Sequence, residues 1–229
     1  RVISDSVALR INAMVERLDN HRDFYDGDRV GVNPTLHIES GDSVIDLSYE
    51  YIDHQRFIDR GIPTGADGRP VEAFEKIVFG DPDVNTTALK AHLWRASVQH
   101  SFSDTLKGNI AAFYGDYDKL YQNFYVAAYD QAQTPDEVTL DGYVDTTQRQ
   151  NSILSANLVG ESEFAGTQHT LLAGVEFIDT SSDQDRWNTF WDTTDDDKET
   201  FSLTRNLGLE GGVGLNALGN VATNSFDRD

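Results

Sequence analysis

Residues 30–51, VGVNPTLHIESGDSVIDLSYEY, contain two runs of alternating apolar and polar side chains. Leu36 and Ile38 belong to the first run, Ile45 and Leu47 belong to the second, and Glu39-Ser-Gly-Asp42 joins the two. A period of two places successive side chains on opposite faces of a strand, and a short connection containing glycine joins antiparallel neighbours. The stretch therefore predicts a β-hairpin with one apolar and one polar face.

The same alternation recurs along the chain and predicts about seven strands. The other five runs are Val7–Val15, Trp94–Phe102, Leu106–Tyr114, Leu154–Leu158 and Leu171–Phe177. We expect strands of about 9–14 residues, against the usual 5–6 of globular sheets. Ser103-Asp104 and Phe164-Ala-Gly-Thr167 are further tight turns, whereas the connections at 52–88, at 118–147 and after Asp179 are long. In an up-and-down sheet, alternate connections lie at the same end, so one rim has short turns and the other has long loops.

Composition excludes several classes of protein. The chain has 229 residues, a formal net charge of -21 and no cysteine. Non-specific nucleic-acid binding needs many Lys and Arg side chains, so this charge argues against it. The sequence has no apolar run of about 20 residues that would predict a membrane helix. No Gly-x-Ser-x-Gly elbow or Gly-rich phosphate loop is present, and the six histidines show no metal-ligand spacing. We therefore expect no catalytic residue, no metal site and no enzymatic activity.

Two architectures fit the alternation. A soluble secreted β-sandwich would bury the apolar face in a core, and a membrane barrel would turn it toward lipid. Strand length, loop asymmetry and aromatic placement favour the barrel, because Tyr49, Tyr51 and Tyr114 lie near the long-loop ends and Phe102 lies beside a tight turn. The sandwich alternative would bind calcium or carbohydrate. Its candidate calcium ligands, none with the full EF-hand spacing, are the acidic runs Asp26-Gly-Asp28, Asp81-Pro-Asp83, Asp116–Asp118 and Asp195-Asp-Asp197.

Several runs resemble the barrel sequence of TonB-dependent siderophore receptors. These runs are Arg29-Val-Gly-Val-Asn-Pro-Thr-Leu36, Leu47–Tyr51, Asp59-Arg-Gly-Ile-Pro63, Phe79-Gly-Asp-Pro82 and His169–Glu176, within residues 5–180. The resemblance implies a 22-stranded parent barrel filled by an N-terminal plug. Seven strands cannot close so wide a barrel. We therefore expect residues 1–229 to form a partial all-β barrel domain, an antiparallel up-and-down transmembrane segment with short periplasmic turns and long extracellular loops, lacking the plug and the C-terminal strands.

The resemblance also implies a function in the bacterial outer membrane. The parent would take up ferric siderophores actively, with the siderophore as cargo and no cofactor of its own. Its partners would be TonB–ExbB–ExbD, reached through the parent's N-terminal region, together with membrane lipid and lipopolysaccharide. A receptor for another nutrient, cobalamin or a saccharide, is the alternative within transport.

Ligand contacts in this family come from loop aromatic and polar side chains. The loop candidates in this chain are Tyr25, Phe57, Arg60, Tyr125, Trp187 and Trp191. Arg60 could supply a bidentate donor fork. Alternatively, Asp59–Pro63 only shapes a loop, with Gly61 in an unusual conformation and Pro63 stiffening its exit. Because the net charge is -21, a strongly anionic chelate would need basic groups from outside this chain.

Overall fold

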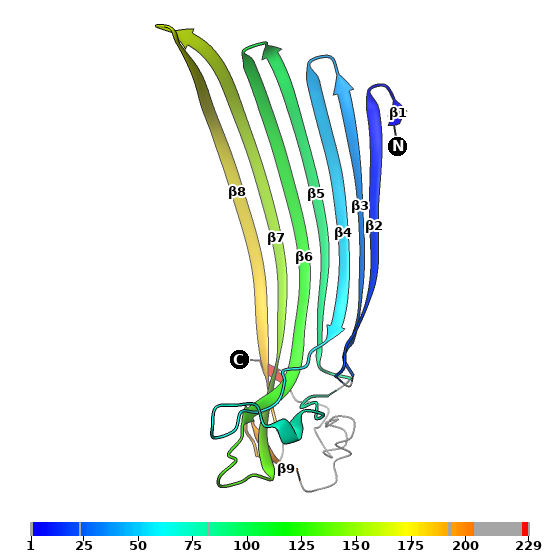
Figure 1. Cartoon of the computed structure of the whole chain (residues 1–229), viewed down its shortest axis with the longest axis vertical. Coiled ribbons are helices and arrows are strands. Elements are labelled where there is room, and N and C mark those ends of the chain that lie inside the picture. The colour runs from blue at the N-terminus through cyan, green and yellow to red at the C-terminus, as the bar shows by residue number, and fades with distance from the viewer. Residues whose placement is uncertain (1, 23, 82, 192–193, 204–225, 229) are drawn as a thin grey trace.

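The computed structural model describes residues 2–22, 24–81, 83–191, 194–203 and 226–228, and these residues form one antiparallel sheet (Figure 1). The strands follow one another in chain order from β1 to β8, β10 pairs with β8, and β9 pairs with β7. The all-β, up-and-down and unclosed sheet that the sequence predicts is confirmed. The elements are β1 (Val2–Ser4), β2 (Val7–Asp19), β3 (Asp26–Ser40), β4 (Ser43–Phe57), η1 (Glu72–Phe74), β5 (Thr86–Ser103), β6 (Leu106–Ala128), β7 (Glu137–Phe164), β8 (Thr167–Thr189), β9 (Glu199–Ser202) and β10 (Phe226–Arg228).

One end of the sheet carries two-residue turns, at the top of Figure 1. They are Asp5-Ser6, Gly41-Asp42, Asp104-Thr105 and Ala165-Gly166. Ala165 and Gly166 both have positive φ, 53° and 73°, which suits the right-handed twist of paired strands. The tight turns predicted within Glu39–Asp42 and Phe164–Thr167 are confirmed, whereas the turn predicted at Ser103-Asp104 lies one residue later, at Asp104-Thr105.

The opposite end carries the longer connections 20–25, 58–85 and 129–136. The prediction of one long loop over 118–147 is wrong, because β6 continues to Ala128 and β7 begins at Glu137. The strand β8 likewise continues past Asp179 to Thr189, and the seven main strands have 13–28 residues. In these extensions carboxylates such as Asp116, Asp118 and Asp179 interrupt the hydrophobic alternation while backbone pairing continues, as between Lys119 and Thr147. Residues 204–225 of the predicted final connection lie outside the described residues.

One face of the sheet is apolar across all seven main strands, and we call it the belt face. Cross-strand pairing aligns one row of it, consisting of Leu9, Leu36, Leu47, Ala96, Ala112, Leu154 and Phe177. Its side chains face outward, with Leu47 at 42 %, Leu154 at 49 % and Phe177 at 67 % exposure. So continuous an exposed apolar surface needs an apolar environment.

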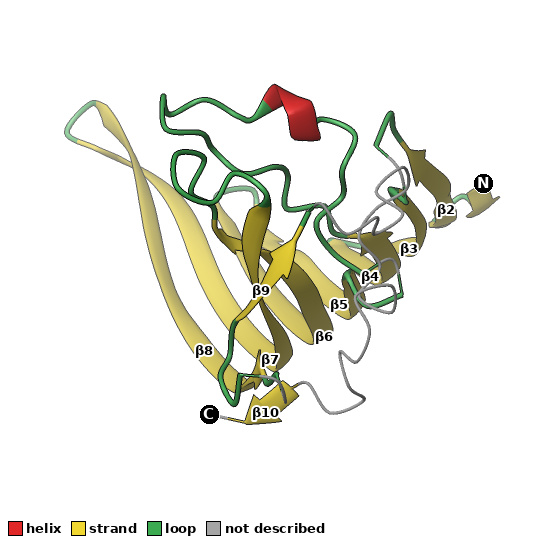
Figure 2. Cartoon of the chain, turned by 90° about the horizontal axis from the view of Figure 1, so that it is seen from below, coloured by secondary structure: helices red, strands yellow, loops and turns green. Residues whose placement is uncertain are grey.

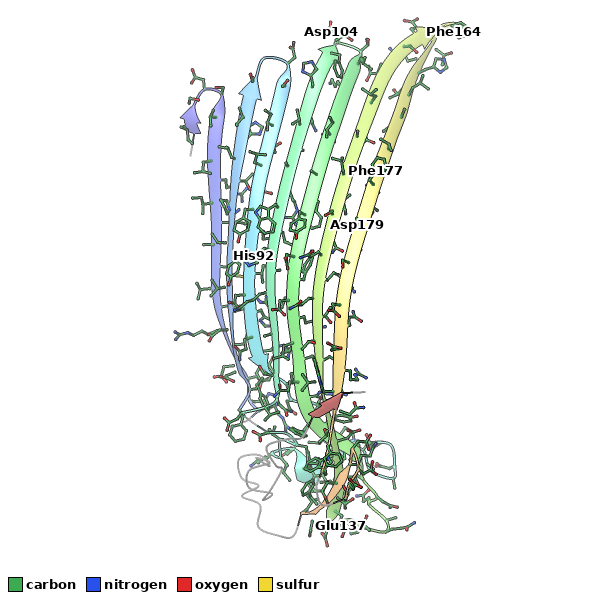
Figure 3. The ribbon with its side chains drawn as sticks, turned by 180° about the vertical axis from the view of Figure 1, so that it is seen from behind. His92, Asp104, Glu137, Phe164, Phe177 and Asp179 are labelled. Carbon is green, nitrogen blue, oxygen red and sulfur yellow. The ribbon has the colours of Figure 1, made fainter. Side chains whose placement is uncertain are left out.

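Aromatic side chains border the belt face toward the long-loop end. Trp94 lies 5.3 Å from Tyr49 and 5.5 Å from Tyr114 between ring centroids. From Leu106 to Tyr114 the strand β6 covers about 27 Å at about 3.4 Å per residue, close to the about 25 Å apolar band of membrane barrels. Figure 3 shows the transition on β8, where Phe177 is followed by Asp179. No helix within the described residues is long and apolar enough to cross a membrane.

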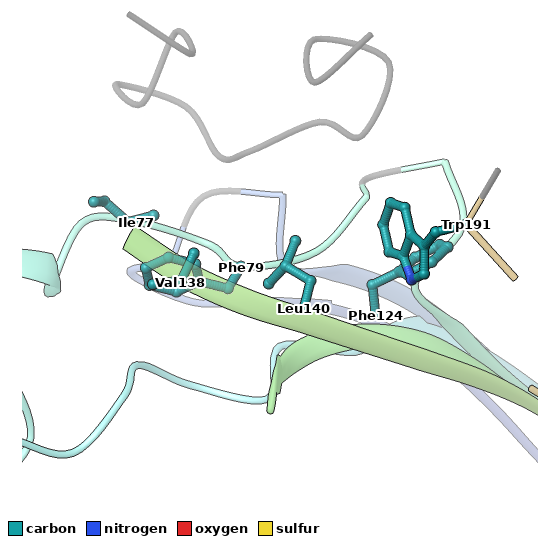
Figure 4. Packing of buried hydrophobic residues seen from close by; sticks show 6 residues of the cluster. All are labelled: Ile77, Phe79, Phe124, Val138, Leu140 and Trp191. Atoms are coloured by element: carbon teal, nitrogen blue, oxygen red, sulfur yellow. The ribbon is translucent and has the colours of Figure 1, made fainter. Parts of the chain in front are cut away.

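The buried core lies at the long-loop end rather than inside the sheet (Figure 4). It joins the connection 58–85, the far ends of β6 and β7, and the segment after β8, through Ile77, Phe79, Phe124, Val138, Leu140 and Trp191. Leu140 has no exposed surface, and the Trp191 ring meets the rings of Phe124 and Phe201 edge-on at 5.8 and 5.2 Å. The core therefore fastens the long connection to the extended β6–β7 hairpin.

Candidate ligand-binding wall

The connection 58–85 is held by a buried ion pair. Arg22, in the β2–β3 connection, contacts Asp59 at 2.6 Å, and their side chains are 14 % and 9 % exposed. The same guanidinium donates to the backbone carbonyls of Glu75 and Ile77, the latter at 2.7 Å. One side chain thus joins both halves of the connection, which lies with η1 on the same side of the sheet as β9 (Figure 2).

Asn85 fastens the end of the same connection to β6. Its amide donates to the carbonyls of Ile58 and Phe124, both at 3.0 Å, and its oxygen accepts from the Phe124 N–H at 2.9 Å. Asn85 therefore satisfies the β6 backbone where the pairing with β5 ends at Thr86. Gly80 is required beside it, because a Cβ there would approach the Asn85 amide nitrogen to 2.3 Å.

This anchoring places Arg60 on the polar face of the β6–β7 hairpin. Its Nη1 donates to Asn123 Oδ1 at 2.9 Å and to the Tyr143 hydroxyl at 3.1 Å. The guanidinium also lies 4.7 Å from the centre of the Tyr125 ring. Partial burial by itself would lower the pKa of Arg60. The Tyr143 and Tyr121 hydroxyls outweigh this effect, so the pKa of Arg60 is raised. Arg60 is therefore a fixed cation whose contacts are neutral side chains.

A second arginine lies on the same aromatic surface. Arg186 forms a bidentate pair with Asp145, with both contacts at 2.6 Å, and its guanidinium lies 4.5 Å from the centre of the Tyr143 ring. Tyr143 also stacks on Tyr121 at 5.9 Å. Beside these residues is a cavity of about 600 Å³, lined by Lys119, Tyr121, Tyr143, Asp145, Thr146, Thr147, Gln184, Asp185 and Arg186. We call this surface, together with Arg60 and Tyr125, the candidate ligand-binding wall.

Tyr125 completes the wall from the side of Asp141. Its hydroxyl donates to an Asp141 carboxylate oxygen at 3.1 Å, and its ring meets that of Tyr143 edge-on. Burial, followed by the Asp141 charge and hydrogen bond, raises the pKa of Tyr125. The phenol is therefore a neutral donor that is already paired, and its ring is the part that faces Arg60.

The structure brings two of the six predicted residues together, namely Arg60 and Tyr125. Tyr25 precedes β3 and lies 3.5 Å from Arg56, and Trp187 is a half-buried residue of β8. Phe57 and Trp191 are 4 % and 3 % exposed, so both pack inside the protein, and the role of the six residues as ligand contacts stays a prediction.

The sequence prediction missed the nine wall residues that line the cavity, Lys119, Tyr121, Tyr143 and Arg186 among them, because it placed 118–147 and the chain after Asp179 in loops. Continuing the period of two from Tyr117 through Lys119 and Tyr121 would have found two of them. The acidic runs do not assemble into a metal site in the described ranges, where no three His, Cys, Asp or Glu side chains are grouped to hold an ion.

Comparison with known proteins identifies the fold. No family model and no curated protein matches the chain. Among solved structures, the ferric-catecholate import receptor Fiu of E. coli K12 matches with a TM-score of 0.65 and 20% identity, over 82% of this chain and 31% of that one. The siderophore receptor PiuA of Acinetobacter baumannii matches with a TM-score of 0.71 and 17% identity, over 87% of this chain and 29% of its own.

The ferripyoverdine receptor of the outer membrane of Pseudomonas aeruginosa, solved with ferripyoverdine bound, matches equally well. Its TM-score is 0.71 at 15% identity, over 92% of this chain and 28% of that receptor. The chain therefore spans about three tenths of the length of these structures. This chain has the fold of a wall segment from the β-barrel of outer-membrane siderophore receptors.

Proposed function

We propose that this chain is part of an outer-membrane receptor barrel that lines the uptake path of ferric siderophores. The observation that supports it best is the exposed belt face, bordered by Tyr49, Trp94 and Tyr114 on a sheet with the receptor fold. A soluble β-sandwich would have to cover this face, yet Leu47, Leu154 and Phe177 remain exposed. The belt face would contact outer-membrane lipid, and the long-loop rim would meet lipopolysaccharide.

In this proposal the candidate ligand-binding wall contacts the siderophore. Arg60 offers a charged donor fork, and Tyr121, Tyr125 and Tyr143 offer ring faces beside the cavity. No residue is given a catalytic role, because the matched structures are receptors. Active uptake and coupling to TonB–ExbB–ExbD would require the whole protein, including a plug.

Uptake by the source bacterium tests this function. We would delete the gene of the full-length protein and measure uptake of radiolabelled ferric siderophores, cobalamin and a saccharide under iron limitation. The proposal predicts that only ferric siderophore uptake is lost and that the protein is recovered in the outer membrane. Selective loss of cobalamin or saccharide uptake would assign the receptor to that nutrient instead. Recovery as a monodisperse soluble protein would refute the membrane assignment.

Variants of the full-length protein then test the wall itself. Arg60→Gln should reduce siderophore uptake, since it removes the charge and the fork while keeping a polar side chain. Arg17→Gln is the matched control, because Arg17 is almost fully exposed and its nearest carboxylate, on Asp28, is 4.0 Å away. Equal uptake by the two variants would remove Arg60 from the proposed contact surface.

A further inference from the structure

Charge is separated between the two faces of β6, β7 and β8 in their long-loop halves. Because β6–β7–β8 pairing has no shift between Leu106 and Val126 or along β8, each residue can be assigned to a face by its register. Lys119, Arg149 and Arg186 lie on the polar face, and the connection 58–85 adds Arg60 to them. We call these four residues the cationic wall.

The opposite face of the same strands is acidic. Over residues 116–126, 138–150 and 179–189, the positions in register with the belt face include five carboxylates and no Lys or Arg. The carboxylates are those of Asp116, Asp118, Asp179, Asp183 and Asp185, of which Asp185 also lines the cavity beside Lys119. The polar face of these strands has two, Asp141 and Asp145. A chain with a net charge of -21 thus concentrates positive charge on one side of three strands.

Three of the four cations are not neutralised by a carboxylate. Arg186 is paired with Asp145, whereas Arg60, Lys119 and Arg149 form no ion pair within 4.0 Å with any residue that the structure describes. Lys119 and Arg149 are exposed, and they are diagonal neighbours because Tyr117 pairs with Arg149 and Lys119 with Thr147. Diagonal cross-strand positions are about 7–8 Å apart. Adjacent like charges repel, so an anion between them would relieve that cost.

We propose that the cationic wall binds an anionic ligand, so that the receptor selects ferric chelates of net negative charge over neutral ones. This inference rests on the proposed function and adds a charge class to its ligand. It differs from the expectation that a strongly anionic chelate would need basic groups from outside this chain, because it places those groups within the chain. Arg60 and Lys119 supply charge, while the Tyr121 and Tyr143 rings beside them offer flat surfaces to the organic shell of the chelate.

The recognition is electrostatic and local. Each charged hydrogen bond contributes about 1.5–3 kcal/mol, and about 1.4 kcal/mol corresponds to a tenfold change in affinity. Removing one wall cation should therefore weaken the binding of a trianionic ligand about tenfold and leave the binding of a neutral ligand unchanged. Salt should weaken only the binding of the trianionic ligand, because it screens charges that are open to solvent.

The test compares two probes on outer membranes from cells that produce the full-length protein. The probes are a trianionic ferric tris-catecholate and a neutral ferric tris-hydroxamate, each radiolabelled and measured by equilibrium binding. The variant is Lys119→Gln. Its control is Lys90→Gln. Lys90 lies opposite Asp118 in the β5–β6 register, one residue from Lys119, so its side chain is on the other face, where it pairs with Asp53. Both variants change the net charge equally, and both side chains are exposed, so neither should affect folding.

The inference expects tighter binding of the trianionic probe, a loss of about tenfold in Lys119→Gln, and no change in Lys90→Gln. Preference for the neutral probe, or equal losses in the two variants, would overturn the charge inference while leaving siderophore uptake intact. Failure of both probes to bind, together with normal iron uptake in the deletion strain, would overturn the proposed function as well.

Discussion

Replacing Arg22 by Met should release the connection 58–85 from the rest of the protein. The Arg22–Asp59 pair is 2.6 Å long and nearly excluded from solvent, and Arg22 also satisfies the carbonyls of Glu75 and Ile77. Met preserves most of the apolar stem but leaves the mostly buried Asp59 carboxylate without its cation, with the Gly61 N–H still donating to it. Breaking one side of a buried pair costs about 3–5 kcal/mol. Local opening of the connection should therefore become about two to four orders of magnitude more frequent.

Hydrogen exchange of the full-length protein measures this opening directly. Peptides within 58–85 contain amides that are protected in the closed state, such as Ile58 bonded to the Asn85 carbonyl and Val71 bonded to the Pro63 carbonyl. These amides should exchange faster by the same factor in Arg22→Met. Amides of β2 to β5 near the tight turns should be unaffected, because the sheet pairing there does not involve the connection.

Arg17→Met is the control for this experiment. Arg17 lies 4.0 Å from Asp28, and both side chains are more than three quarters exposed, so the pair should contribute little to stability. Unchanged exchange of 58–85 in Arg22→Met would refute the reasoning, since it would mean that the core and Asn85 hold the connection without the ion pair. Partial recovery in Arg22→Lys would indicate that the charge, rather than the fork, is the main contribution.

Three further substitutions test other parts of the structure. If the belt face meets lipid as proposed, Leu47→Arg should cost about 2–4 kcal/mol and reduce the amount of protein assembled in the outer membrane, because it places a charge on that face. Ser48→Arg, one residue along and on the polar face, should be tolerated. Trp191→Ala should cost about 3–5 kcal/mol of packing in the long-loop core, measured as a lower melting temperature of the near-ultraviolet circular dichroism. Asp141→Asn should lower the pKa of Tyr125 in a phenolate absorbance titration, with Tyr125→Phe giving the baseline. Because the folded pKa of Tyr125 is raised, the stability that it contributes is present below its ordinary value of about 10 and is lost as the pH rises through the folded value.

The half of the fold next to the tight turns could be predicted from the sequence. Between the tight turns and the aromatic border, one face is apolar and the other polar, so the side chains follow the strand period directly. The pairs Leu36 with Leu47 and Ile110 with Ala156 are examples. The turns were also visible, because the two-residue connections use glycine or short polar residues where the backbone requires them, as at Gly41.

The long-loop half could not be predicted in the same way. Past Tyr114, the strand β6 alternates between Asp116 or Asp118 on one face and Tyr117 or Lys119 on the other, so no hydrophobic period remains. Backbone pairing alone extends the hairpin there. The cationic wall depends on that register, since Arg186 and Arg60 reach Tyr143 from segments far apart in sequence. The burial of Trp191 could not be predicted for the related reason that nothing local in the chain reveals the core that covers it.

The extended β6–β7 hairpin explains how one connection can serve both the core and the wall. At the long-loop end, β4 stops at Phe57 and β5 starts at Thr86, whereas β6 continues to Ala128. The β6–β7 hairpin therefore extends past its neighbours. The connection 58–85 contacts two consecutive residues of β6, because Phe79 belongs to the same buried cluster as Phe124 and Arg60 bonds to Asn123. Since Asn123 and Phe124 are adjacent and both fully buried, a shift of the core must also move Arg60. The hydrophobic packing therefore sets the position of the charge that the ligand would meet.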